Sequence, residues 1–252
     1  MSKISRLTLS RAAAPLILLL LWYAVAFFMK APLILPFPHT VLIRLFLLCK
    51  TLLFWKSFAF SFFRVISAFL ISFSIGFITG FFAADFPVFK AFLTFPLAVI
   101  RVTPVIAFIL IALFWFKSGM VPVCVAVLMA LPIMITASEK GFEKNTENKE
   151  KLFKASCYGL TGFQAFRYIR LPSAMPSVLS GSESAFGLCW KVVAAGEVLS
   201  IPRFAVGTMM QKAQIHLETP DVLAMTTALI SASGLTQYII KKSIIKRCSK
   251  NH

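Results

Sequence analysis

Four ionisable side chains lie inside long apolar stretches, where a charge either has a chemical use or needs a partner: Arg101, Glu183, Lys191 and Glu197. A charged group in such surroundings is costly and usually faces protein or a water-filled path. The chemistry that these residue types offer is the binding of a charged solute or the formation of a buried ion pair.

The window 178–200 is one-sided. At about 100° per residue, a wheel gathers one stripe within roughly 80°, with Lys191 just beyond its edge; the stripe holds Glu183, Gly187, Trp190, Ala194 and Glu197. Such a stripe does not face lipid comfortably, so it is expected to line a translocation path or a seam between two copies. The alternative is a structural pair of Glu197 or Glu183 with Arg64 or Arg101, and the residues leave both open.

Arg101 stands two residues before Thr103-Pro104. Because a proline disfavours helix in the residue before it, the helix is expected to break here. A broken helix in a membrane often borders a substrate cavity, where an arginine would favour an anion. The alternative is a helix-end arginine that snorkels to the inner interface.

Other site chemistries are not indicated. The three histidines, His39, His216 and His252, are isolated, and the five cysteines are scattered without a CxxC pair. The cysteines are therefore interpreted as small hydrophobes, and no metal site is expected. The chain has no nucleophile–base arrangement and no G-x-x-x-x-G-K-[ST] phosphate loop. We expect no catalytic residue and no bound cofactor, so any ATP would be used by a separate protein.

The elements that must position these residues are transmembrane helices. Of 252 residues, 59% are hydrophobic and 14% charged, whereas soluble domains are nearer half apolar and a quarter charged. We predict an all-α integral membrane protein in one domain, 1–252. Within the second span, Gly76 and Gly80 predict close helix contact. The six expected spans are about 12–29, 65–84, 97–116, 118–138, 178–200 and 222–240.

Charge distribution predicts the orientation. The segment 41–63 is apolar, but Arg44, Lys50 and Lys56 point to three sides of a helix, so we place it at the outer interface. With both termini inside, most of the 26 Lys and Arg residues lie on the cytoplasmic side. The net charge of +17 is then explained by an anionic membrane leaflet rather than by nucleic acid.

The internal loop 139–176 is dense in charge. Its first half has helix formers and stops at Gly159, and Thr161 is expected to cap a second short helix that ends before Leu171-Pro172. Phe163, Phe166 and Arg170 recur there at helical spacing. Two short helices with an aromatic knob and a basic rim suit a protrusion that docks into a groove. A solvated basic loop is the alternative, and the residues alone leave both open.

Several motifs of the chain resemble one family. Gly159, twelve intervening residues and Pro172 resemble the "EAA" signature of the permease subunits of ABC importers. The stretch 190–200 (WKVVAAGEVLS) resembles the fifth-span motif of the nitrate/sulfonate/taurine branch. The segments 35–38 (LPFP) and 103–119 are similar to further parts of that branch.

The resemblance implies a type I permease with six transmembrane helices and a cytoplasmic coupling loop between the fourth and fifth. It implies contact with an ATPase through a set that we list as Phe153, Ala155, Gly159, Phe163, Phe166, Arg167, Arg170 and Pro172. The chain departs from the signature where the family has Glu-Ala-Ala. Phe153-Lys154-Ala155 stands there, and Glu150 is expected to take over the contacts of the missing acid.

The resemblance further implies binding partners and a cellular location. These are a cytoplasmic ABC ATPase dimer that binds ATP-Mg, an extracytoplasmic solute-binding protein, a second permease copy as a homodimer, and membrane lipid. The place is the bacterial cytoplasmic membrane, with both termini cytoplasmic. The implied cargo is a small organic or inorganic anion of the sulfonate or nitrate kind, or a vitamin precursor.

Two other function classes are weighed. A secondary carrier or channel would need no ATPase, and a visible inverted repeat that would favour it is missing. An integral membrane enzyme acting on lipid head groups would need acidic metal ligands or an acid–base pair near the interface. The inner-face acids, Asp85 and four glutamates of the loop, show no such spacing.

Overall fold

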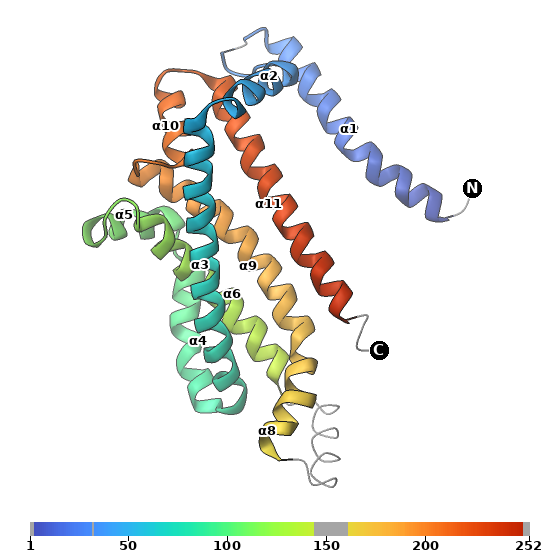
Figure 1. Cartoon of the computed structure of the whole chain (residues 1–252), viewed down its shortest axis with the longest axis vertical. Helices are drawn as coiled ribbons and strands as arrows, with labels where there is room; N and C mark the ends of the chain where they lie inside the picture. Colours follow the sequence, from blue (N-terminus) through green and yellow to red (C-terminus); the bar gives the residue numbers. More distant parts are fainter. Residues whose placement is uncertain (1–2, 32, 144–160, 249–252) are drawn as a thin grey trace.

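The part of the chain that the structure describes is built from helices (Figure 1). The computed structural model describes residues 3–31, 33–143 and 161–248, and no strand occurs among them. The elements are α1 (Lys3–Met29), α2 (Pro38–Cys49), α3 (Leu52–Asp85), α4 (Pro87–Val102), α5 (Val105–Trp115), α6 (Val121–Phe142), α8 (Gly162–Ala165), the π-helical turn η1 (Phe166–Arg170), α9 (Leu171–Ser200), α10 (Val206–Ile215) and α11 (Thr219–Cys248).

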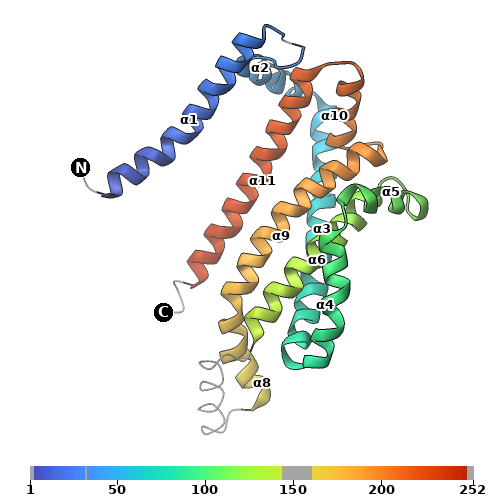
Figure 2. The ribbon, with the colours of Figure 1, turned by 180° about the vertical axis from the view of Figure 1, so that it is seen from behind.

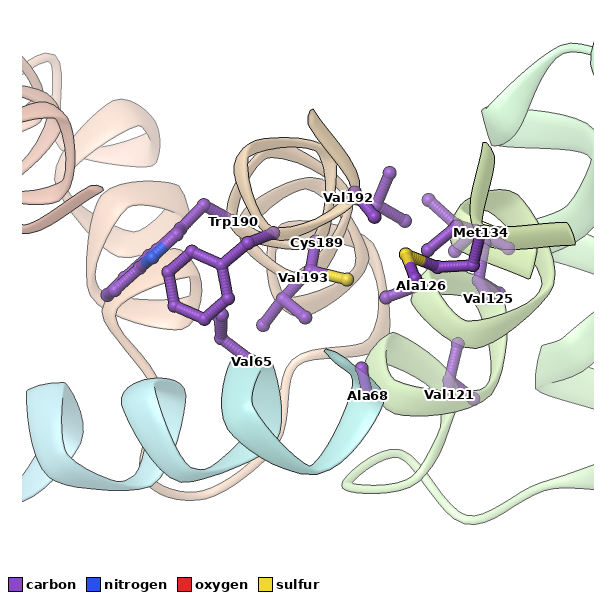
Figure 3. Packing of buried hydrophobic residues seen from close by; sticks show 14 of the residues in the cluster. Val65, Ala68, Val121, Val125, Ala126, Met134, Cys189, Trp190, Val192 and Val193 are labelled. Carbon is purple, nitrogen blue, oxygen red and sulfur yellow. The ribbon is translucent and has the colours of Figure 1, made fainter. Parts of the chain in front are cut away.

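Helices α3, α6 and α9 form the central bundle. Figure 3 shows its apolar core, to which Val65 of α3, Val125 of α6 and Val193 of α9 all belong. Small residues bring the backbones together. A Cβ atom on Gly76 or Gly80 of α3 would overlap α6, which confirms the predicted close contact. Close helix contact at these glycines therefore adds to the packing of the larger core side chains, such as Phe186 and Trp190 of α9.

Three described helices are long and apolar enough to cross a membrane: Leu52–Asp85, Val121–Phe142 and Thr219–Ile239. The pair α4 and α5, bent by 99°, is a fourth span if it counts as one. The expected spans in α9 and α1 are not among these helices. Helix α9 carries three charges, and the described apolar part of α1 is only Ala13–Met29. The fold is thus helical and multi-pass, and the number six stays a prediction.

The second span is longer than expected. Helix α3 begins at Leu52, where Thr51 caps it by accepting a bond from the amide of Phe54 at 3.4 Å. The segment 41–63 is therefore not a separate element, because α2 takes its first part and α3 its second, and its expected place at the outer interface stays a prediction. At about 1.5 Å per residue, 34 residues exceed a hydrocarbon core of about 30 Å. The first turns of α3, with Lys56, have room to lie outside that core.

The third span, expected at 97–116, is two helices. Helix α4 ends at Val102 and α5 begins at Val105, with Thr103-Pro104 between them, as the proline predicts. The fifth span also differs, since α8, η1 and α9 follow one another without a gap. The expected end of a short helix before Leu171-Pro172 is wrong. Pro172 stands at the start of α9, directly after η1, and has no amide hydrogen to donate back into that turn.

Helix α1 extends away from the central bundle in both views (Figures 1 and 2). It is fastened near α2, where the indole of Trp22 donates to the carbonyl of Pro36 at 3.2 Å. The hydroxyl of Tyr23 lies 3.1 Å from Nδ1 of His39. Helices α2 and α10 lie at the end of the molecule opposite α8, which we call the far end; the end with α8 is the loop end.

Candidate functional site

Glu197 of α9 is almost fully buried, at 1% exposure, and its carboxylate is saturated with donors. Arg64 Nη1 of α3 lies 2.8 Å from Oε1. The hydroxyl of Ser61 and the amide of Gly207 donate to Oε2 at 2.8 and 3.1 Å. Both oxygens are thus used within the chain, which is the structural pairing that the sequence offered as the alternative.

Arg64 extends this contact into a network at the far half of the bundle. Its guanidinium also donates to the carbonyls of Phe204 at 2.9 Å and Gly119 at 3.3 Å. Ser61 in turn accepts the amide of Val206 at 3.0 Å. The network joins α3, α9, the turn before α6 and the start of α10. A buried charge pair needs such additional hydrogen bonds to offset its desolvation.

The rest of the predicted stripe on α9 also packs within the chain. The indole of Trp190 lies between the rings of Phe58 and Phe62, with centroids 6.3 and 5.9 Å away. Gly187 faces the side chain of Gln237 on α11. Glu183 is half-buried, and it also interacts with another group of the protein. Helices α3, α10 and α11 therefore cover most of the surface that was expected to line a path or a seam.

Another face of α9 is open. Ser180, Ser184, Lys191 and Ala195 are exposed and recur at helical spacing. The ammonium of Lys191 makes no ion pair with any residue that the structure describes. This small, polar face was missed from the sequence, although its spacing of four, seven and four residues is a usable signal.

Arg101 lies at the last turn of α4, beside the helix break. Its Nη2 donates to the carbonyl of Pro132 at 3.2 Å and to the hydroxyl of Thr136, both on α6. The side chain is otherwise exposed. Both acceptors are neutral groups, so neither of these two contacts is an ion pair.

The described half of the internal loop begins at Thr161 with the predicted cap. The side chain of Thr161 accepts the amide of Gln164 at 3.4 Å, and the amide of Thr161 donates to Oε1 of Gln164 at 2.8 Å. Phe163 is 72% exposed, and Arg167 is exposed as well. Together with Tyr168, which is 68% exposed, these side chains form a free aromatic and basic tip.

Two of the predicted coupling residues, Phe166 and Arg170, make contacts with the bundle. The ring of Phe166 packs on Phe81 of α3 and Phe142 of α6, with centroids 5.5 and 6.2 Å away. Arg170 pairs with Asp85 at the end of α3 through two hydrogen bonds of 2.9 and 2.7 Å. Pro172 is exposed at the start of α9. Phe153, Ala155 and Gly159 lie outside the described residues.

Comparison with known proteins gives the family. Residues 72–247 match the family described as "Binding-protein-dependent transport system inner membrane component". The chain belongs to this family. A permease of this kind is a transport subunit of the inner membrane and not an enzyme.

Curated relatives place the permease in a branch. It is 26% identical over 214 residues to the taurine transport system permease protein of Escherichia coli, covering 82% of this chain and 77% of that protein. It is 32% identical over 80 residues to a putative aliphatic sulfonates transport permease protein of the same organism, covering 32% of this chain and 30% of that protein. A trimethylamine N-oxide transport system permease protein of Ruegeria pomeroyi is 26% identical over 164 residues, which are 65% of this chain and 25% of that protein. The chain is an ABC importer permease of the sulfonate/taurine branch, as the motifs predicted.

Proposed function

We propose that the chain is the membrane-spanning subunit of an ATP-driven importer. Two copies form the translocation path, and each offers its 145–172 loop to a cytoplasmic ATPase that binds ATP-Mg. A solute-binding protein delivers the cargo on the other side. The observation that carries this proposal is the exposed tip formed by Phe163, Arg167 and Tyr168 in a chain of this family.

The tip has the composition of a docking surface. Aromatic and arginine side chains dominate the energetic centres of protein interfaces. The capping box at Thr161 and the continuous helix from Gly162 into α9 hold the tip on a rigid support. The membrane orientation that follows puts the loop end and both termini in the cytoplasm, in agreement with the positive-inside rule.

The second copy is supported by α1 and by α4. Helix α1 stands away from the bundle, and none of the residues of α4 is buried. Faces of this kind take up either lipid or another helix. We propose that a second permease copy covers part of them and encloses the path, with lipid covering the rest.

The cargo that the charges favour is a small anion. Arg101 and Lys191 offer positive charge on exposed surfaces of spans, and neither makes an ion pair with an acidic residue that the structure describes. Taurine and aliphatic sulfonates, named for two relatives, carry a sulfonate anion. We propose a sulfonate-like anion as the cargo of this chain.

Vesicles holding the permease with its ATPase and binding protein test the proposal. Labelled taurine and a longer alkyl sulfonate are offered outside, with ATP inside. The proposal expects accumulation that depends on ATP and is lost when ATP is replaced by a non-hydrolysable analogue. Accumulation without ATP, driven by an ion gradient, would contradict it and favour a secondary carrier.

A further inference from the structure

Among its contacts with the bundle, the described half of the loop makes one ion pair, between Arg170 and Asp85 of α3. We infer that Asp85 and Arg170, backed by the rings of Phe81, Phe142 and Phe166, form the joint that passes movement of the loop to α3 and α6. This inference rests on the proposed function. Both charged residues are positioning residues, because they act through the helices and touch neither cargo nor nucleotide.

The geometry of the pair suits a joint that keeps its orientation. Two parallel N–H···O bonds, at 2.7 and 2.9 Å, fix the plane of the guanidinium against the carboxylate of Asp85. The guanidinium also lies over the ring of Phe81, 5.0 Å from its centroid. The side chains are only 16% and 19% exposed, so solvent screens the pair weakly.

An aromatic stack supports the pair from the loop side. Phe142, the last residue of α6, packs edge-on against Phe81 with centroids 5.1 Å apart. Phe166 completes the stack with both rings. The end of α3, the end of α6 and the turn η1 therefore meet in one contact, and a displacement of η1 moves both helices.

The π-helical turn η1 accounts for the position of Arg170 beside Asp85. Pro172 has no amide hydrogen, so it leaves the carbonyl of Tyr168 without its usual helical donor. The amide of Leu171 bonds to the carbonyl of Phe166, five residues back. Such turns occur frequently at functional sites. At η1 the backbone continues from the tip into α9, while the side chain of Arg170 reaches Asp85 of α3.

A second pair makes α3 and α9 move together. Near the far end Arg64 of α3 pairs with Glu197 of α9, and at the loop end Asp85 of α3 pairs with Arg170 at the start of α9. The polarity is reversed between the two pairs. Helix α3 thus contributes the cation to one pair and the anion to the other, and the continuous segment of η1 and α9 contributes the opposite partners, so sliding by a turn would break both pairs at once.

The test measures ATP hydrolysed per solute taken up in vesicles holding the complete importer. Arg170→Ala is expected to raise this ratio at least about fivefold, the lower range of typical coupling effects, while the ATPase still binds. Arg170→Lys keeps the charge but not the paired bonds, so an intermediate ratio is expected. The exchange of Asp85→Arg together with Arg170→Asp is expected to restore part of the coupling.

Lys90→Ala is the matched control. Lys90 pairs with Glu139 at 2.7 Å between α4 and α6 and is outside the joint. Its loss is expected to leave the ratio unchanged. If Arg170→Ala fails to assemble, Arg170→Lys and the exchange variant decide by the same ratio. Wild-type coupling in an assembled Arg170 variant overturns the joint. Failure of the wild-type chain to recruit an ATPase would instead refute the proposed function.

Discussion

Arg64 and Glu197 face each other across α3 and α9, with Nη1 and Oε1 2.8 Å apart and the carboxylate 1% exposed. Ser61 and Gly207 each donate a further hydrogen bond to the same carboxylate. Of the two roles that the sequence left open for Glu197, a solute path and a structural pair, the structure shows the pair, which joins α3 to α9. This relationship gives the first prediction.

Removal of both partners of this pair should cost less unfolding free energy than the two single removals added together. Glu197→Ala leaves the guanidinium of Arg64 buried without its anion, which typically costs about 3–5 kcal/mol of unfolding free energy. The double variant Arg64→Ala with Glu197→Ala should cost less than the sum of the two single variants. Denaturation in detergent measures all three. Additive costs, within about 0.5 kcal/mol, would show that the two side chains do not interact.

Close packing of α6 on α9 gives the second prediction. A Cβ atom on Gly181 would overlap the Cβ of Ala137, whereas nothing lies within 4 Å of one on Gly234 of α11. Gly181→Ala should therefore lower the unfolding free energy by about 1–3 kcal/mol through overpacking. Gly234→Ala, the same change in an open place, should be neutral or stabilise by up to about 1 kcal/mol. Equal effects of the two changes would contradict the described contact.

The positive charge at the helix break gives the third prediction. Arg101→Glu replaces the cation beside Thr103-Pro104 with an anion and should reduce uptake of a sulfonate about tenfold or more, because a charged cleft concentrates its counter-ion. Arg101→Lys should retain most of the uptake. Initial rates of labelled uptake are the measurement.

A charge-matched control separates the position from the net charge. Arg203→Glu makes the same reversal at the far end, where the guanidinium lies over the ring of Phe204 at 5.3 Å. It should leave ATP-dependent uptake near the wild-type rate. Unchanged uptake by Arg101→Glu would remove the argument for an anion.

Local backbone chemistry made part of this fold predictable. The break at Thr103-Pro104, the cap at Thr161 and the contact at Gly76 each follow from a residue type and its immediate neighbours. The family was predictable as well, because its signature is spread over short motifs that need no three-dimensional information.

Long-range pairing was not predictable. Lys56, in the extended first part of α3, lies over Phe204, 4.1 Å from its centroid, and Arg44 of α2 pairs with Asp221 of α11 at 2.6 Å. Both partners are far along the chain. A helical wheel likewise showed that one side of α9 is polar but not which helices cover it. The same reason hid Asp85 as the partner of Arg170.

The most direct test of the central claim is the recovery of the ATPase. The tagged chain is purified in mild detergent from its host membranes, and its partners are identified by mass spectrometry. The account predicts a soluble P-loop ATPase in amounts equal to the chain. Phe163→Asp, which places a charge on the exposed tip, should lose it, with about 2 kcal/mol or more of binding free energy removed, whereas Lys90→Ala should keep it. Recovery of the wild-type chain alone, while other complexes of the same membrane survive, would contradict the account.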